Sequence, residues 1–315
     1  MYKDKITIVT ALFNCGRDKV EFQTRADNCY IEYFKFWARI KNEVVVYTSQ
    51  NLADKIINVR KQFGLEDRTK IIIIDDIWKI EADLLQEMCV IENKAEFIKL
   101  RIRRDDISNQ AKYNYIMLMK YWFMKDAVER KIADSQVAWL DFGYNHGGAV
   151  FSNAEDFEFE WKYNFSNKIQ LFARKEQSEE MGLVKLLSMS DSIMGAPVIA
   201  PANLCDKLYE LCRDAMWALV TLDCYDDDQA LLRMAYKRMP SIFELHMSDW
   251  FLPIKEYGGG HIRINEQKSF HSFNAKDYII NLMSEAKKVI FPNCSRKDVK
   301  AVGKNIEKAI MRELS

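Results

Sequence analysis

Short apolar runs, rich in β-branched residues, recur along the first half of the chain. Three of them, at residues 6–12 (ITIVTAL), 44–48 (VVVYT) and 71–74 (IIII), show no sustained alternation with charged residues. Strands that are covered on both faces have this pattern, as in a parallel sheet between two layers of helices. The pattern therefore predicts strands of a parallel sheet.

The stretches between these runs have helical spacing. Residues 25–40 carry aromatic residues at positions i, i+3, i+4 and i+7, residues 53–63 have a similar apolar face, and a long helix is predicted at 111–132. That helix leads into a fourth apolar strand at 137–140, which ends at Asp141. Alternating strands and helices indicate βαβ units, so the sequence predicts an α/β fold.

Further elements are expected in the second half of the chain, where no Gly/Ser/Pro linker and no internal repeat divides the sequence. They are strands at 169–173 and 193–200 and helices at 201–219 and 229–237. We therefore expect one domain over residues 1–283. From residue 284 onward the chain is predicted to form a helical tail, 284–315.

Composition and charge narrow the functional classes. The chain has 315 residues and a formal net charge of zero, so it lacks the basic surplus of a nucleic-acid-binding protein. No apolar run reaches the roughly 18 to 20 residues of a membrane span, and the N-terminus has no signal-peptide pattern. Seven cysteines without a CxxC motif indicate free thiols in a reducing compartment. These features predict a cytoplasmic protein.

The expected tail is basic. Residues 287–315 contain eight basic and three acidic side chains, a net charge of +5. A basic helix can bind an anionic membrane surface, which would place the protein at the inner face of the inner membrane. A helix that packs on the domain, with its charges in solvent, is the simpler interpretation.

The strongest chemical signal is residues 137–144, VAWLDFGY. An apolar strand here delivers Asp141 to the edge of the sheet at which open α/β folds bind their ligands. One carboxylate together with a diphosphate can hold Mn²⁺ or Mg²⁺. Nucleotide-sugar transferases commonly have a D-x-D motif at this point, but Gly143 replaces the second aspartate. The alternative is an aspartate that only begins a turn; the DFG of a protein kinase is excluded because its partner motifs are missing.

Two other acidic clusters have a simple explanation in helix capping. Asp75 and Asp76 follow the third predicted strand, and residues 226–229 (DDDQ) precede a predicted helix. Acidic side chains at a helix N-terminus satisfy backbone N–H groups and interact favourably with the helix dipole. The functional alternative, for Asp228 and Gln229, is that a carboxylate orients the acceptor hydroxyl or acts as its base.

Two further segments carry candidates for the site. Lys112 and Lys120 lie on the long predicted helix, and one of these cations could face a diphosphate, although such side chains usually extend into solvent. His261 follows three glycines, which permit a closing loop, and could complete a metal shell. It could equally be structural or solvated, because the four histidines match no metal-binding motif.

The first predicted strand leads into a turn of small residues that ends at Arg17. At the carboxyl end of a strand, such a turn could hold a nucleotide base and its phosphates. The turn matches neither the Walker A loop nor GxGxxG, and a plain turn with a solvated Arg17 is the alternative.

Four segments resemble the HtrL/YibB (WlaTB) family in their order and spacing. They are ITIVTALFNCGR at 6–17, VVVYTS at 44–49, KYNYIMLMKYWF at 112–123 and WLDFGY at 139–144. The resemblance implies a single GT-A-like domain, which is a Rossmann-type nucleotide-diphospho-sugar fold with a mixed central sheet. It would have a donor-binding half at about 1–145 and an acceptor half at about 146–283. It also implies glycosyltransferase activity in surface-glycan assembly, such as lipopolysaccharide or capsule biosynthesis.

The same resemblance implies residue roles. Those for the donor nucleotide are Thr10, Ala11, Phe13 and Arg17, and the one for the diphosphate and its metal ion is Asp141. Asp228 with Gln229 is similar to a D-Q pair that precedes a helix in some retaining GT-A enzymes, and Gly195 falls where those enzymes often have an acceptor-side loop.

We therefore expect a glycosyltransferase of the hexosyl type that uses a nucleotide sugar, UDP-linked by default, and a glycan or lipid-linked acceptor, with Mn²⁺ or Mg²⁺ as the expected cofactor. Charge on the leaving diphosphate would be neutralised by the divalent ion or by cationic side chains. The rival is a non-catalytic nucleotide- or glycan-binding protein of the same fold, which Gly143 favours. A nucleotidylyltransferase would need a glycine-rich basic loop near the N-terminus, which is not evident.

Overall fold

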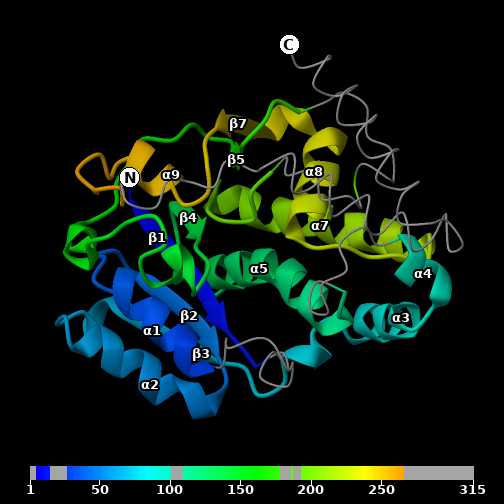
Figure 1. Ribbon diagram of the computed structural model, residues 1–315, viewed down its shortest axis with the longest axis horizontal. Coiled ribbons are helices and arrows are strands. Elements are labelled where there is room, and N and C mark those ends of the chain that lie inside the picture. Colours follow the sequence, from blue (N-terminus) through cyan, green and yellow to red (C-terminus); the bar gives the residue numbers. More distant parts are fainter. Residues whose placement is uncertain (1–4, 15–26, 101–108, 178–185, 187–192, 266–315) are drawn as a thin grey trace, which may run out of the picture. The chain divides into compact units, whose positions relative to one another are not determined.

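Seven strands form one sheet within the residues that the computed structural model describes, which are 5–14, 27–100, 109–177, 186 and 193–265 (Figure 1). In order across the sheet they are β3 (Thr69–Ile73), β2 (Val44–Thr48), β1 (Ile6–Leu12), β4 (Gln136–Trp139), β6 (Val198–Pro201), β5 (Ile169–Ala173) and β7 (Phe243–Met247). β6 is antiparallel to both of its neighbours, and every other pair is parallel. Six strands therefore end at the same edge of the sheet, which we call the carboxyl edge.

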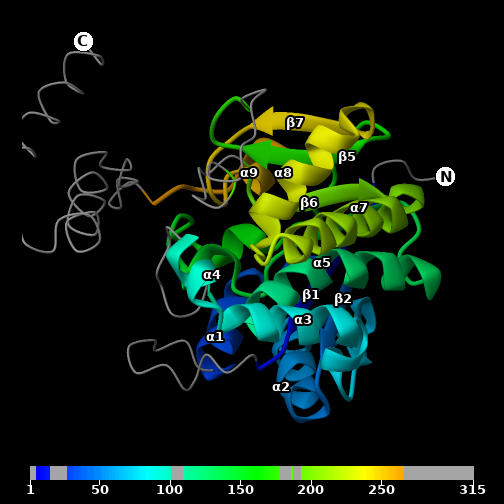
Figure 2. The ribbon, with the colours of Figure 1, turned by 90° about the vertical axis from the view of Figure 1, so that its right-hand side faces the viewer.

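Helices cover both faces of this sheet. α3, α5, α7 and α8 pack on one face, and α1 and α2 pack on the other (Figure 1, Figure 2). The α-helices are α1 (Asp27–Trp37), α2 (Gln50–Lys61), α3 (Ala82–Glu92), α4 (Ala95–Leu100), α5 (Ala111–Glu129), α7 (Ala202–Thr221), α8 (Asp228–Arg238) and α9 (Pro253–Glu256). Short 3₁₀ turns are η2 (Glu66–Arg68), η3 (Ile77–Lys79), η4 (Tyr144–Gly147), η5 (Ala154–Phe157) and η6 (Pro240–Ile242).

Both faces of the central strands are buried. In β1, Val9 belongs to the hydrophobic cluster beneath α5, and Ile8 belongs to the cluster beneath α1. A strand with two buried faces needs apolar residues at consecutive positions, because successive side chains point to opposite faces. The strands predicted at 6–12 and 44–48 are therefore confirmed, as is the α/β fold with a mixed sheet.

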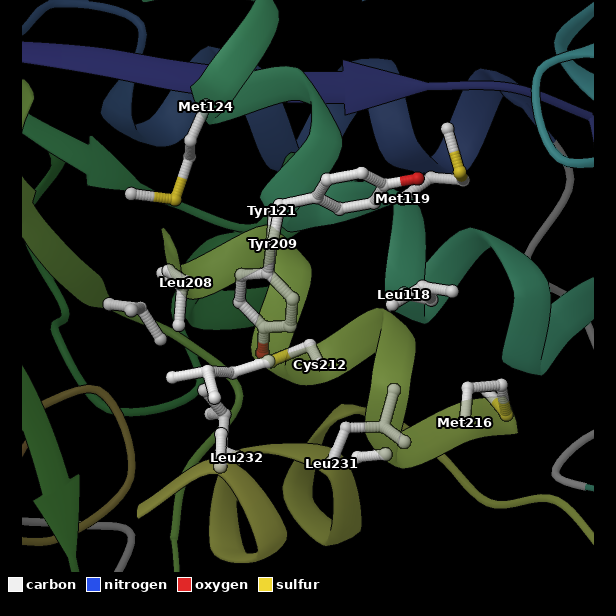
Figure 3. Close-up of a cluster of buried hydrophobic side chains, with 14 of the residues drawn as sticks. Leu118, Met119, Tyr121, Met124, Leu208, Tyr209, Cys212, Met216, Leu231 and Leu232 are labelled. Carbon is white, nitrogen blue, oxygen red and sulfur yellow. The ribbon is translucent and has the colours of Figure 1, made fainter. Parts of the chain in front are cut away.

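The helices α5, α7 and α8 share a closely packed interior (Figure 3). Leu118 and Tyr121 of α5 face Leu208 and Cys212 of α7, and Leu231 of α8 closes the cluster from below. All five side chains are fully buried, so Cys212 is a core residue. A core at this density holds its helices at fixed separations. Side chains that α5 and α8 direct toward the sheet are thus held in fixed relative positions.

Some elements differ from the prediction. Neither α3 nor β7 is among the predicted elements. α3 buries Leu84, Met88 and Ile91 at helical spacing, whereas β7 buries only Phe243 and so has little pattern. The strand predicted at 193–200 is present only from Val198 onward. The predicted tail, 284–315, lies outside the described residues. No helix among the described residues is long and apolar enough to cross a membrane.

Candidate active site

The candidate site lies at the carboxyl edge, where β4 ends beside the start of the antiparallel strand β6. Asp141 follows β4 after one further residue, Leu140, whose backbone N–H still donates to Val9 of β1. The side chains of β4 alternate, so Asp141 points to the same face as Trp139, which is the face covered by α5, α7 and α8. The predicted position of Asp141 at a strand end is confirmed.

Lys120 joins two carboxylates at this point. Its Nζ lies 2.8 Å from Oδ1 of Asp141 and 2.5 Å from Oδ2 of Asp228. Lys120 comes from the middle of α5 and Asp228 is the first residue of α8, so three separate elements meet at one nitrogen. Only 4% of the Lys120 side chain is exposed. Such an arrangement stays ordered only because the two carboxylates compensate the buried positive charge.

The surroundings of Lys120 keep it charged. Burial by itself lowers the pKa of Lys120. The charges and hydrogen bonds of Asp141 and Asp228 outweigh that effect and raise the pKa well above its ordinary value. Burial raises the pKa of Asp228, and the neighbouring Lys120 ammonium opposes that change. The site therefore contains a permanent cation, because Lys120 does not lose its proton in the physiological range.

The two carboxylates differ in their access to solvent. The Asp141 side chain is 46% exposed, whereas that of Asp228 is 5% exposed. The indole Nε1 of Trp139 donates a 2.8 Å hydrogen bond to Oδ1 of Asp141, the same oxygen that accepts from Lys120. Asp141 is thus fixed by two donors on one oxygen, and it is the acid of this pair that a ligand can reach.

Asp228 does not cap its helix. The N-cap of α8 is Asp227, whose side chain accepts from the backbone N–H of Gln229 at 3.1 Å. Asp228 is therefore available to Lys120, and it is also covered by Gly195, where a Cβ would lie 1.9 Å from Oδ2 of Asp228. Gln229 is partly exposed beside it. By contrast, Asp76 accepts from the N–H of Trp78 as the N-cap of η3, so the capping interpretation of that cluster is confirmed.

The residues expected to bind the donor nucleotide lie at the carboxyl end of β1. Thr10 is fully buried, and its hydroxyl makes no hydrogen bond within the described part of the chain. Ala11 and Phe13 are partly exposed, and the Phe13 ring stacks on Phe123 at 5.8 Å. Phe123 in turn stacks on Trp139 at 6.0 Å, so a row of aromatic rings connects the end of β1 to Asp141. Arg17 lies outside the described residues.

A tight loop follows Asp141. Asn145, His146, Gly147 and Gly148 all have positive φ, which is unfavourable for the two residues with side chains. The buried Asn145 amide holds this conformation, since its oxygen accepts from the N–H groups of Val150 and Phe151. The loop keeps Gly143 close to α1, where a Cβ on Gly143 would lie 3.0 Å from the Tyr30 ring.

His261 is not brought to this site. Its ring hydrogen-bonds the backbone oxygen of Asp156 at 2.9 Å and contacts Phe159. The Phe159 carbonyl accepts from Lys41, which precedes β2, so His261 lies near the opposite edge of the sheet from Asp141. Within the described ranges, no group of three His, Cys, Asp or Glu side chains could hold a metal ion. At Asp141 itself, the ammonium group of Lys120 lies between the carboxylates of Asp141 and Asp228.

Several residues of the site are not predicted by the sequence pattern. Trp139 is visible there only as a strand residue, although its indole N–H orients Asp141. Arg174 follows β5 at the carboxyl edge and pairs with Asp249, which follows β7, at 2.8 Å. The position of Arg174 directly after an apolar strand is visible in the sequence, but that of Asp249 is not, because β7 is not predicted. No local pattern could have shown that Gly195 packs against Asp228.

The sequence matches a family model described as "Bacterial protein of unknown function (HtrL_YibB)" over residues 4–257. The chain is also 23% identical over 268 residues to Protein HtrL of Escherichia coli (strain K12), an alignment that covers 79% of this chain and 91% of the relative.

Two solved structures are similar to this fold at a low level. The PaToxG glycosyltransferase has a TM-score of 0.35 at 10% identity, with 75% of this chain and 70% of that chain covered. Mouse xyloside xylosyltransferase 1, in its apo form, has a TM-score of 0.37 at 8% identity, with 76% and 84% covered. At these scores neither structure supplies residue roles for this chain.

Proposed function

The chain belongs to the HtrL/YibB family of bacterial proteins, and from its site we propose that it is a glycosyltransferase. It moves a sugar of the hexose class from a nucleoside diphosphate sugar, UDP-linked by default, to a surface glycan or glycolipid acceptor. The observation that carries this proposal is the buried Lys120, which bonds Asp141 and Asp228 at the carboxyl edge of the sheet. Parallel α/β sheets bind ligands at this edge.

The chemistry of glycosyl transfer suits a fixed cation at this position. The bond between the sugar C1 and the diphosphate oxygen breaks, so negative charge increases on the leaving group. A preorganised positive charge stabilises that change more effectively inside a protein than in water. Lys120 has three N–H donors, and Asp141 and Asp228 use two of them, which leaves one for a diphosphate oxygen.

The remaining residues divide into donor and acceptor roles. Asp141, which is partly exposed, accepts hydrogen bonds from the donor sugar or diphosphate region, and Phe13 lies where the nucleotide would extend along the end of β1. Asp228 lies 2.5 Å from the Lys120 nitrogen, so we assign it a positioning role through Lys120. Gln229, which is partly exposed next to it, is the side chain that can reach the sugar or the acceptor.

The location of the acceptor is a second part of the proposal. A lipid-linked acceptor at the inner membrane would suit the net charge of +5 on residues 287–315. Binding to vesicles that contain anionic lipid, measured for the full chain and for a chain that ends at residue 283, tests this part. Equal binding by both leaves only a soluble acceptor or an uncharged docking mode.

Two measurements test the enzyme assignment. UDP and other nucleoside diphosphates should raise the melting temperature, because a ligand that binds only the folded state stabilises it. The protein should also hydrolyse a nucleotide sugar slowly without acceptor, and Asp141→Asn should reduce this rate by about 100-fold or more while its circular dichroism spectrum is unchanged. Tight nucleotide binding without turnover of any donor, with or without Mn²⁺, would instead support the non-catalytic rival.

A further inference from the structure

We propose that the ammonium group of Lys120 takes the place of a divalent cation between Asp141 and Asp228, so that the protein binds its donor diphosphate without a resident metal ion. The part about the donor rests on the proposed glycosyltransferase function. The part about the metal ion rests only on the described side chains.

The geometry around Lys120 is that of a cation site already filled. Oxygens of two carboxylates, Asp141 and Asp228, lie at 2.8 and 2.5 Å from one nitrogen. Mg²⁺ and Mn²⁺ would compete with the ammonium group for these two carboxylates, because hard cations prefer carboxylate ligands. An ion added beside the buried ammonium would be repelled by it at short range, where little water screens the two charges.

Oδ1 of Asp141, which contacts Lys120, also accepts a hydrogen bond from the neutral indole of Trp139. Nε1 of Trp139 lies 2.8 Å from Oδ1 of Asp141, and the Lys120 nitrogen is 5.8 Å from the centre of the same indole ring. The indole thus orients the carboxylate toward Lys120 and lies near the ammonium group. Both contacts favour the ammonium group of Lys120 at this point. A metal ion would need several oxygen ligands in a set arrangement, which the indole does not provide.

The position that would supply a second metal-binding carboxylate is tightly packed. In a D-x-D motif this carboxylate would come from residue 143, but here Gly143 packs against α1. A Cβ at that position would lie 3.0 Å from Cε1 and 3.1 Å from Cδ1 of Tyr30, and 3.4 Å from Tyr33. A longer acidic side chain would need the tyrosines to move. The packing of α1 thus favours glycine at residue 143, and Lys120 supplies the positive charge between the carboxylates.

Removal of the Lys120 side chain should have a specific effect on metal binding. If Lys120 fills a cation site, its removal leaves two carboxylates that face each other across a gap one small ion can bridge. Their mutual repulsion favours binding of a divalent cation, which would supply the missing positive charge. Lys120→Ala should therefore gain a Mn²⁺ site that the wild-type protein does not have.

The first arm of the test is calorimetric titration of MnCl₂ into the full-length wild-type protein and into Asp141→Asn, both without nucleotide. We expect the two titrations to be alike. A stoichiometric Mn²⁺ ion that binds the wild-type protein and is lost in Asp141→Asn overturns the proposal, whichever other residues take part. This arm does not depend on the stability of any Lys120 variant.

The second arm measures thermal unfolding with and without MnCl₂. Mn²⁺ should raise the melting temperature of Lys120→Ala by several degrees, and the double variant Lys120→Ala, Asp228→Asn should lose that rise. Lys125→Ala is a matched control from the same helix, because Lys125 also lies between two carboxylates, Asp206 at 3.0 Å and Glu129 at 3.6 Å, but both of these carboxylates are more than half exposed. A folded Lys120→Ala that Mn²⁺ does not stabilise contradicts the proposal, and the first arm decides if this variant does not fold.

The third arm compares UDP binding to the wild-type protein in EDTA and in MnCl₂. We expect dissociation constants that agree within about twofold, whereas binding at least about tenfold tighter in MnCl₂ overturns the proposal. If UDP and other nucleoside diphosphates bind under neither condition, the proposed donor is contradicted. The titration of Mn²⁺ alone then still decides whether Lys120 replaces a metal ion.

Discussion

The carboxylate of Asp228 lies directly against the Cα of Gly195. A Cβ at residue 195 would be 1.9 Å from Oδ2 and 2.4 Å from Cγ of Asp228, a separation that no pair of non-bonded atoms tolerates. Residue 195 must therefore be glycine for Asp228 to reach Lys120 in this geometry. The start of α8 thus packs against the segment before β6 only because residue 195 has no Cβ.

Gly195→Ala should consequently move Asp228 away from Lys120. We expect a loss of stability of about 1–3 kcal/mol, as for other overpacked buried sites, together with a fall in donor hydrolysis. Urea unfolding and the hydrolysis assay measure the two effects. Gly260→Ala is the control, because a Cβ at Gly260 meets nothing within 4 Å and should leave both quantities unchanged. Wild-type behaviour of Gly195→Ala would show that the contact with Asp228 is not constrained.

Replacing Asp228 separates its role from that of its neighbour. Asp228→Asn keeps the N-cap of α8, which belongs to Asp227, but removes one of the two negative charges that hold Lys120. We expect turnover to fall by about tenfold or more, because misplacement of a catalytic cation is costly, while the thermal shift produced by UDP persists. Full activity in Asp228→Asn would remove this residue from the site.

Asp227→Ala provides the complementary variant. It should lower stability by about 1 kcal/mol through loss of the cap and leave turnover nearly unchanged. Urea unfolding and the hydrolysis assay again measure both. If Asp227→Ala abolishes turnover without a change in stability, then Asp227 serves the reaction and Asp228 does not.

The charge of Lys120 should be visible in the dependence of stability on pH. The pKa of Lys120 is raised by folding, so its contribution to stability is fully present below the pKa of the unfolded chain, about 10.4, and is lost as the pH rises above that value. Between pH 9 and 11 the free energy of unfolding should therefore fall more for the wild-type protein than for Lys120→Met. The difference should be about 1 kcal/mol for each pH unit above the pKa of the unfolded chain. Parallel curves for the two proteins would mean that Lys120 is not held as a cation.

Trp139→Phe tests how Asp141 is oriented. Phenylalanine keeps most of the buried ring but removes the Nε1 donor, so Oδ1 of Asp141 retains only Lys120. We expect donor hydrolysis to fall by about ten- to 100-fold, because small losses of alignment are amplified in catalysis. The melting temperature should change far less than the rate. Trp122→Phe, a partly buried tryptophan of α5 that packs on Tyr47, is the control for loss of an indole elsewhere.

The sequence by itself determined the order of most strands and helices. Its apolar runs at 6–12 and 44–48 have no polar alternation because both faces of those strands are buried, and this property is local to each run. The long apolar run of α5 and the placement of Asp141 at the end of β4, one residue beyond its last residue, are local in the same sense. β7 escaped prediction because an edge strand with one fully buried residue has little pattern of its own.

The site was decided by tertiary structure, because its contacts join segments that the sequence keeps apart. Lys120 and Asp228 are separated by 108 residues, and neither has a neighbour in sequence that indicates the other. Local rules of helix capping offer no reason to choose Asp228 over Asp227, which differ only in where α8 directs their side chains. His261 was a candidate metal ligand because it follows three glycines. Its hydrogen bond to Asp156 places it near the opposite edge of the sheet. Local composition sets which segments form strands and helices, whereas the packing of helices across the sheet sets which charges meet.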